Sequence, residues 1–82
     1  MESIKNWLSP YTRAIMAVDI FGQSCDIANI MEFANKHNLK VITDTAQAPG
    51  SIYNGTKTGV KSNIGGYSLN YHKHIHTGEG GI

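Results

Sequence analysis

Hydrophobic residues form two different patterns along the chain, a continuous run and a helical repeat. Residues 13–21 are almost continuously apolar and do not alternate with polar residues, which is typical of a strand covered on both faces in a parallel sheet. Residues 22–24 interrupt this run. Between residues 26 and 37 the apolar positions recur at helical spacing, which predicts an amphipathic helix with the stripe Ile27, Ile30, Met31 and Ala34.

The predicted helix leads into a second strand. Ser24 or Asp26 is suited to cap the start of the helix, and Asn38 is suited to a left-handed turn at its end. Residues 39–43 form a short apolar run that ends at Asp44. A strand, a helix and a strand in this order predict a right-handed βαβ unit with parallel strands.

The flanking regions are richer in turn-forming residues. Residues 4–8 have helical spacing and stop before a proline. Residues 49–59 contain the Asn54-Gly55 pair, which favours a short hairpin. Residues 64–69 predict a further strand whose glycines permit close backbone approach. Residues 72–82 predict a loop rich in glycine and histidine.

Together these elements predict an α/β fold with a mostly parallel sheet. Such a sheet needs helices on both faces, yet the pattern contains only one full crossover helix. The sequence also stops directly after a Gly-rich stretch. We therefore expect residues 1–82 to be a piece of one larger α/β domain.

Composition argues against several kinds of partner. The 82 residues are 40% hydrophobic and 16% charged and have a net charge of +1, which argues against a nucleic acid or a membrane surface as the partner. The single cysteine, Cys25, cannot form an internal disulfide, which fits a reducing compartment. The start lacks the layout of a signal peptide, and no apolar run is long enough to cross a bilayer. We expect a cytoplasmic protein.

Two side chains are candidates for chemistry. Asp44 follows a predicted parallel strand, at the end where ligands bind in open α/β sheets; it is either a cap on the following turn or a partner for a cationic ligand group. Lys73 lies between His72 and His74, and neighbouring imidazoles and partial burial would favour its neutral, nucleophilic amine. The alternative for Lys73 is an exposed loop lysine.

Three histidines suggest a weaker hypothesis. His72, His74 and His76 alternate, so on a strand they would share one face, as in a metal site. No cysteine or acidic residue obviously completes such a site. A small metal-binding module therefore remains a minor alternative, and we expect no metal.

Four blocks of sequence carry a resemblance to a known family. They occur at residues 12–22, 30–42, 44–50 and 66–74, and the last runs on to the Gly-Glu-Gly-Gly of residues 78–81. In this order they make the chain similar to the DegT/DnrJ-type sugar aminotransferases. The resemblance implies the aspartate-aminotransferase-like fold, known as fold type I. It also implies pyridoxal 5′-phosphate (PLP) as the cofactor.

The resemblance also implies a role for each of four residues. Lys73 matches the lysine that bonds covalently to PLP and carries the proton during amine exchange. Asp44 matches the carboxylate that faces the pyridine nitrogen, and Gln47 matches the residue near the phenolic oxygen of the ring. Gln47 has an alternative as a turn-stabilising amide. Ser68 matches a hydroxyl that donates to the cofactor phosphate.

The implied reaction transfers an amino group from an amino acid to a keto-sugar nucleotide, in a homodimer. Some dehydratase relatives have histidine in place of the lysine, so Lys73 favours transamination over dehydration. Family members are several times longer, so residues 1–82 would be a partial PLP-binding large domain that lacks the N-terminal part and the C-terminal domain. An inactive truncated remnant is the alternative, and we expect the isolated piece to be inactive.

Overall fold

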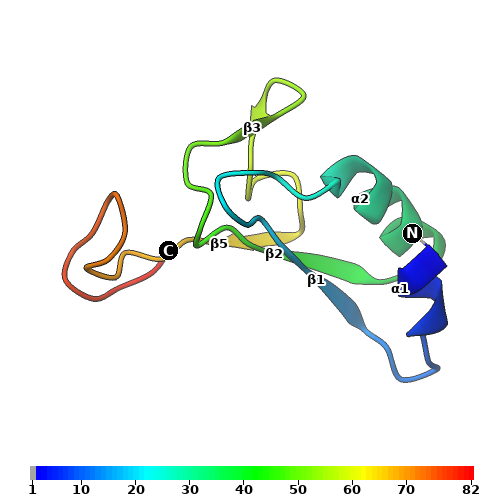
Figure 1. Ribbon diagram of the computed structural model, residues 1–82. Helices are drawn as coiled ribbons and strands as arrows, with labels where there is room; N and C mark the ends of the chain where they lie inside the picture. The colour runs from blue at the N-terminus through cyan, green and yellow to red at the C-terminus, as the bar shows by residue number, and fades with distance from the viewer. Residues whose placement is uncertain (1) are drawn as a thin grey trace.

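Three parallel strands form the central sheet. The computed structural model describes residues 2–82, and its sheet contains β1 (Ala14–Val18), β2 (Lys40–Asp44) and β5 (Ile64–Gly66) in the order β1-β2-β5 (Figure 1). In the register, Asp44 pairs with Val18 on one side and with Gly66 on the other. All three strands therefore end at one edge of the sheet, and Asp44 lies at the middle of that edge.

One helix crosses from β1 to β2 and supplies the core. This helix, α2 (Ile27–Lys36), packs on the sheet with its apolar stripe. The buried cluster between them consists of Ile27, Ala34, Leu39 and Val41. The βαβ unit and its parallel strands are therefore confirmed.

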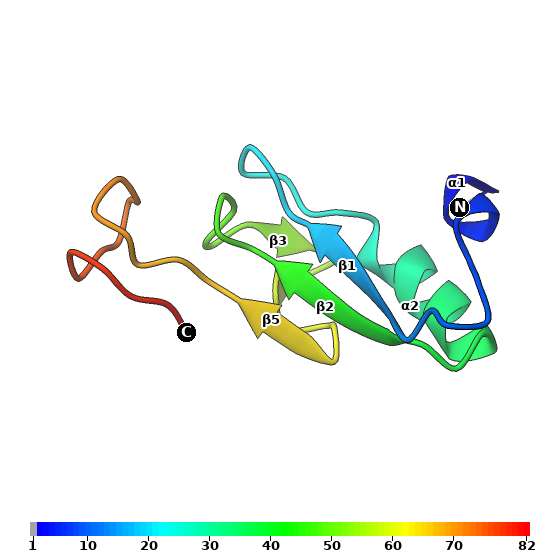
Figure 2. The ribbon, with the colours of Figure 1, turned by 90° about the horizontal axis from the view of Figure 1, so that it is seen from below.

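Within residues 2–82, no helix covers the opposite face of the sheet. Figure 2 shows the strands from this side, in front of α2. Ala17 is buried, but its neighbours Met16 and Val18 are 67% and 46% exposed. The expectation of a strand covered on both faces is therefore not met within residues 2–82, because the crossover helix covers one face only.

Strand β1 is also shorter than predicted. It ends at Val18, and Phe21 and Gly22 then adopt positive φ angles of 54° and 76° in a tight turn. A bridge between Ile20 and Gln23 closes this turn. The apolar run from 13 to 21 thus contains a strand and the turn that follows it.

The start of α2 differs from the prediction, whereas its end agrees. Asp26 occupies the N-cap position, but its carboxylate forms no capping hydrogen bond. It accepts instead from Asn29 Nδ2 and from the Tyr53 phenol, both at 2.6 Å. Ser24 donates its hydroxyl to the carbonyl of Cys25, so neither predicted cap is formed. At the other end Asn38 has the expected positive φ of 54°.

The turn-rich segment forms the predicted hairpin. Strands β3 (Ile52–Tyr53) and β4 (Thr56–Lys57) are antiparallel. Between them Asn54 and Gly55 have φ angles of 48° and 75°, as a two-residue hairpin turn requires. A short helix, α1 (Glu2–Asn6), precedes β1. No helix within residues 2–82 has the length and apolar character needed to span a membrane.

Strand β5 ends at Gly66, three residues earlier than predicted. The chain beyond it pairs with its own end. The N–H of Tyr67 donates to the carbonyl of Ile82 at 2.7 Å, and the N–H of Leu69 donates to that of Gly80 at 2.8 Å. Residues 70–79 therefore form a loop that is closed at its base.

Candidate functional site

Asp44 forms the cap that was one of the two alternatives for this strand-end carboxylate. Its Oδ1 accepts the N–H of Ala46 at 3.0 Å, so it caps the turn after β2. No partner within residues 2–82 donates to Oδ2, and the side chain is exposed. Because side chains alternate along a strand, Asp44 lies on the helix-free face, opposite to Val41. The cap therefore leaves one carboxylate oxygen open to a ligand.

The turn after Asp44 is fixed by its backbone. Thr45 is fully buried, and its N–H donates to the carbonyl of Gly66 at 2.8 Å. The N–H of Ala48 donates back to the carbonyl of Thr45 at 3.1 Å. The N–H of Gly22 donates to the carbonyl of Gln47 at 3.0 Å. The main chain of Gln47 is thus held while its side chain remains exposed.

Gln47 and Lys73 line the same hollow. Its volume is about 420 Å³, and its walls come from residues 21–22, 46–49 and 72–74. Lys73 is half-buried there, and its N–H donates to the carbonyl of Asn70 at 2.9 Å. Two of the four predicted site residues, 26 positions apart in sequence, are therefore brought together.

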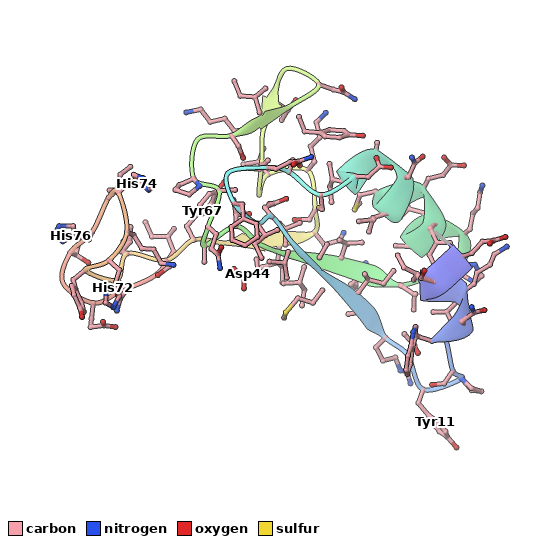
Figure 3. All side chains as sticks on the ribbon, in the orientation of Figure 1. Tyr11, Asp44, Tyr67, His72, His74 and His76 are labelled. Atoms are coloured by element: carbon pink, nitrogen blue, oxygen red, sulfur yellow. The ribbon has the colours of Figure 1, made fainter. Side chains whose placement is uncertain are left out.

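Ser68 lines a neighbouring hollow. That hollow has a volume of about 460 Å³ and shares Pro49 with the first one. Ser68 is half-buried, and its Oγ accepts the N–H of Asn70 at 3.3 Å. Figure 3 shows Asp44 at the end of its strand, beside the segment that leads into the loop of residues 70–79. Neither Asp44 nor Ser68 lines the hollow of Lys73.

The three histidines do not form a cluster. Residues 71–75 adopt turns and bends, so the strand that would align these side chains is absent there. His72, His74 and His76 lie at separate positions around the loop (Figure 3). In the part of the chain that the structure describes, no group of three or more His, Cys, Asp or Glu side chains is placed to hold a metal. The structure therefore does not support the metal-binding module.

One buried carboxylate was missed by the sequence analysis. Asp19 is only 1% exposed and accepts the N–H of Cys25 at 2.8 Å and the hydroxyl of Thr45 at 2.7 Å. Burial, followed by a hydrogen bond to Asp19 and its charge, raises the pKa of the Cys25 thiol from 9.0 to about 12. The available signal was an acidic residue within an otherwise apolar run.

Comparison with known proteins extends over the whole chain. The sequence profile of the DegT/DnrJ/EryC1/StrS aminotransferase family matches residues 1–82. The GDP-perosamine synthase of Caulobacter vibrioides is 45% identical over 75 residues, which is 92% of this chain and 20% of that protein. The chain thus spans about a fifth of the length of this relative.

Solved structures agree with this similarity. The aminotransferase from Psychrobacter cryohalolentis superposes with a TM-score of 0.92 at 43% identity, over 98% of this chain and 20% of that one. An Escherichia coli GDP-4-keto-6-deoxy-D-mannose-3-dehydratase with bound hydrated PLP superposes with a TM-score of 0.84 at 28% identity. That match covers 98% of this chain and 21% of the dehydratase. The parallel α/β architecture is therefore shared with part of a larger fold.

Proposed function

Because the chain belongs to the DegT/DnrJ/EryC1/StrS aminotransferase family, we propose that it is the PLP-binding segment of a sugar-nucleotide aminotransferase. The complete protein would transfer an amino group from an amino acid to a keto-sugar nucleotide. The observation that carries this proposal is the family match over residues 1–82, together with a hollow that Gln47 and Lys73 both line. The GDP-perosamine synthase similarity supports a nucleotide sugar as the acceptor.

The side chains at this edge of the sheet fit PLP. The cofactor carries an aldehyde, a ring nitrogen that binds a proton and a phosphate. Lys73 supplies a half-buried amine, Asp44 an open carboxylate oxygen, and Ser68 a half-buried hydroxyl. An amine, an anion and a hydroxyl donor are the complementary groups for these three parts.

Lys73 is proposed as the catalytic residue. Bound PLP supplies an electron-accepting ring and an aldehyde carbon that takes up amines. The Nζ of Lys73 would attach the cofactor when it is neutral, because only the free amine is nucleophilic. Once released, the same Nζ would remove a proton from the donor's amine-bearing carbon in the first half of the exchange, and in the second half it would deliver a proton to the carbon of the acceptor that receives the amine.

The other proposed residues bind and orient. The carboxylate of Asp44 would accept a hydrogen bond from the protonated ring nitrogen, which keeps that proton in place. The amide of Gln47 would contact the phenolic oxygen of the ring. The hydroxyl of Ser68 would donate to the phosphate. The resemblance further supports a cytoplasmic homodimer as the working form of the complete protein.

A dehydratase is the second candidate, because a solved sugar dehydratase shares this architecture. By the family resemblance, some dehydratase relatives carry histidine at the position that Lys73 occupies here. A lysine there can both attach the cofactor and return a proton to it, which transamination requires. Lys73 therefore favours the aminotransferase.

The test uses a graft, in which the aligned residues of this chain replace the matching stretch of the Caulobacter vibrioides enzyme. The graft is incubated with PLP, reduced with borohydride and digested, and the added mass is mapped. We expect it on Lys73, and we expect Lys73→Ala to lose both the adduct and synthesis of GDP-perosamine. Lys40→Ala, at the end of β2 opposite to Asp44, is the matched control and should keep both. An adduct on Lys57 or Lys61 would contradict the assignment.

A further inference from the structure

Asp19 is a buried carboxylate whose two oxygens are both hydrogen-bonded. It follows β1, and only 1% of its surface is exposed. Its Oδ1 accepts the N–H of Cys25 at 2.8 Å and its Oδ2 accepts the hydroxyl of Thr45 at 2.7 Å. Both partners are donors, so each oxygen of the carboxylate acts as an acceptor. This pair of contacts satisfies the side chain.

Within residues 2–82, no lysine, arginine or histidine forms a salt bridge with this carboxylate. The salt bridge within residues 2–82 joins Lys36 to Glu32 on the exposed surface of α2 and does not involve Asp19. Burying a carboxylate without a cation costs free energy, which hydrogen-bond donors offset only in part. A buried carboxylate at this position is therefore not explained by its contribution to stability, and its contacts point to a further role.

These contacts join two segments that line the hollow of Lys73. The N–H of Asp19 donates to the carbonyl of Asp44 at 2.9 Å, and its carboxylate holds Thr45, the next residue. Three residues further on, Gly22 donates to the carbonyl of Gln47 at 3.0 Å. The turn of residues 44–47 is thus tied at both ends to residues 19–22. Gly22 and Gln47 both line the hollow.

We propose that Asp19 is a positioning residue that holds the turn of residues 44–47 at the edge of the hollow lined by Lys73. It acts through Thr45, whose hydroxyl donates to its Oδ2. Without it, the Asp44 carboxylate and the Gln47 amide would no longer be held at fixed positions relative to Lys73. The consequence for cofactor binding rests on the proposed function. The effect of Asp19 on the position of the turn of residues 44–47 does not depend on it.

The test is residue-resolved amide hydrogen exchange of the graft, in which residues of this chain are completed by the rest of the Caulobacter vibrioides enzyme. Asp19→Asn keeps the shape of the side chain but has a single acceptor oxygen, so it cannot accept from both the Cys25 N–H and the Thr45 hydroxyl. Thr45→Val removes the hydroxyl from the other side, and Thr45→Ser retains it. We expect Asp19→Asn and Thr45→Val to speed exchange at Gly22 and Ala48 at least about tenfold.

Other amides serve as the internal reference. Those of Ile30 and His37 in and after α2 should exchange as in the wild type, and Thr45→Ser should restore protection of the turn. Glu32→Gln, an exposed carboxylate on α2, is the matched control and should change neither region. If Thr45 acted only through packing, protection of the turn would not be retained in Thr45→Ser and lost in Thr45→Val.

Three outcomes would overturn the proposal. The first is that amide exchange at the turn is unchanged in both Asp19→Asn and Thr45→Val. The second is that exchange becomes faster by the same factor in α2 and in the turn. The third is that the amides of the turn are not protected even without a substitution. A second arm treats the graft and its Asp19→Asn variant with PLP and borohydride. Absence of a Lys73 adduct in the unsubstituted graft would contradict the proposed function and leave the exchange result standing. Faster exchange at the turn with fewer adducts in the variant would support both.

Discussion

The carbonyl oxygen of Gly59 occupies the space beside Gly65 in which any other residue would place its Cβ. Gly65 is the central residue of β5 and pairs with Thr43 of β2. The segment after the hairpin therefore packs backbone against backbone on the strand. Gly59 itself has a φ of 84°, a conformation that other residues rarely adopt.

Because of this contact, we expect the substitution of Gly65 by alanine to lower the stability of the chain. Gly65→Ala would force its Cβ into the main chain of Gly59, which cannot move aside as a flexible side chain could. We expect a loss of about 1–3 kcal/mol of unfolding free energy, as for other overpacked sites. Gly66→Ala is the matched control in the same strand, since its Cβ would meet only the Thr43 carbonyl at 3.9 Å. Urea unfolding of the two variants measures the difference, and equal losses would contradict this explanation.

The sequence was sufficient for the elements whose pattern is local. The period of α2, the left-handed Asn38, the Asn54-Gly55 hairpin and the close approach at Gly65 all follow from spacing or from residue type. The parallel pairing followed from the order of elements and the length of the crossover.

What the sequence could not supply depends on distant partners. Asp26 has a residue type suited to a helix cap, but its carboxylate accepts a hydrogen bond from the phenol of Tyr53, 27 residues away. Asp19 is hydrogen-bonded to Thr45, which lies 26 residues further along the chain and beyond the helix, so no local pattern connects the two. The meeting of Gln47 with Lys73 in one hollow likewise depends on how the last loop folds back.

Asp44→Asn separates the two roles of this side chain. Asparagine retains an oxygen that can accept the Ala46 N–H, so the turn should persist. It lacks the charge proposed to hold the proton on the ring nitrogen. A charged hydrogen bond is worth roughly 1.5–3 kcal/mol, so we expect at least about a tenfold slower synthesis of GDP-perosamine by the graft. The Lys73 adduct should still form. Unchanged turnover would reduce Asp44 to a cap.

The raised pKa of the Cys25 thiol predicts how the free energy of unfolding depends on pH. Its pKa in the folded chain is raised from 9.0 to about 12, by burial first and then by the hydrogen bond to Asp19 and its charge. The folded state therefore holds this proton more tightly than the unfolded state. Its contribution to stability is full below pH 9.0 and is lost as the pH rises toward about 12.

Two measurements check this. Urea unfolding should show a free energy that falls over this pH range, and less steeply in Cys25→Ser. Alkylation of Cys25 at a pH near 9 should be much slower in the folded chain than in urea, because the thiolate is the reactive form. Equal alkylation rates in both states would show that the thiol is not perturbed.

The helix-free face of the sheet predicts that the 82-residue chain associates with itself. Met16, Ile42 and Ile64 lie in one cross-strand row on this face, and Met16 and Ile64 are 67% and 62% exposed. The outer edges of β1 and β5 are also unpaired within residues 2–82, and open edges template further pairing. Contiguous apolar surface of this kind favours association. We expect concentration-dependent oligomers in sedimentation, and no transamination by the isolated chain with PLP and an amino donor.

A charge on this face should oppose the association. Met16→Lys places an ammonium group in the centre of the row and should shift the chain toward monomer at a given concentration. Asn35→Lys adds the same charge on the exposed side of α2, so it controls for the change in net charge and should leave the oligomers intact. If both variants dissociate equally, net charge and not the apolar row governs the association. A wild-type chain that stays monomeric at high concentration would show that this face does not drive association.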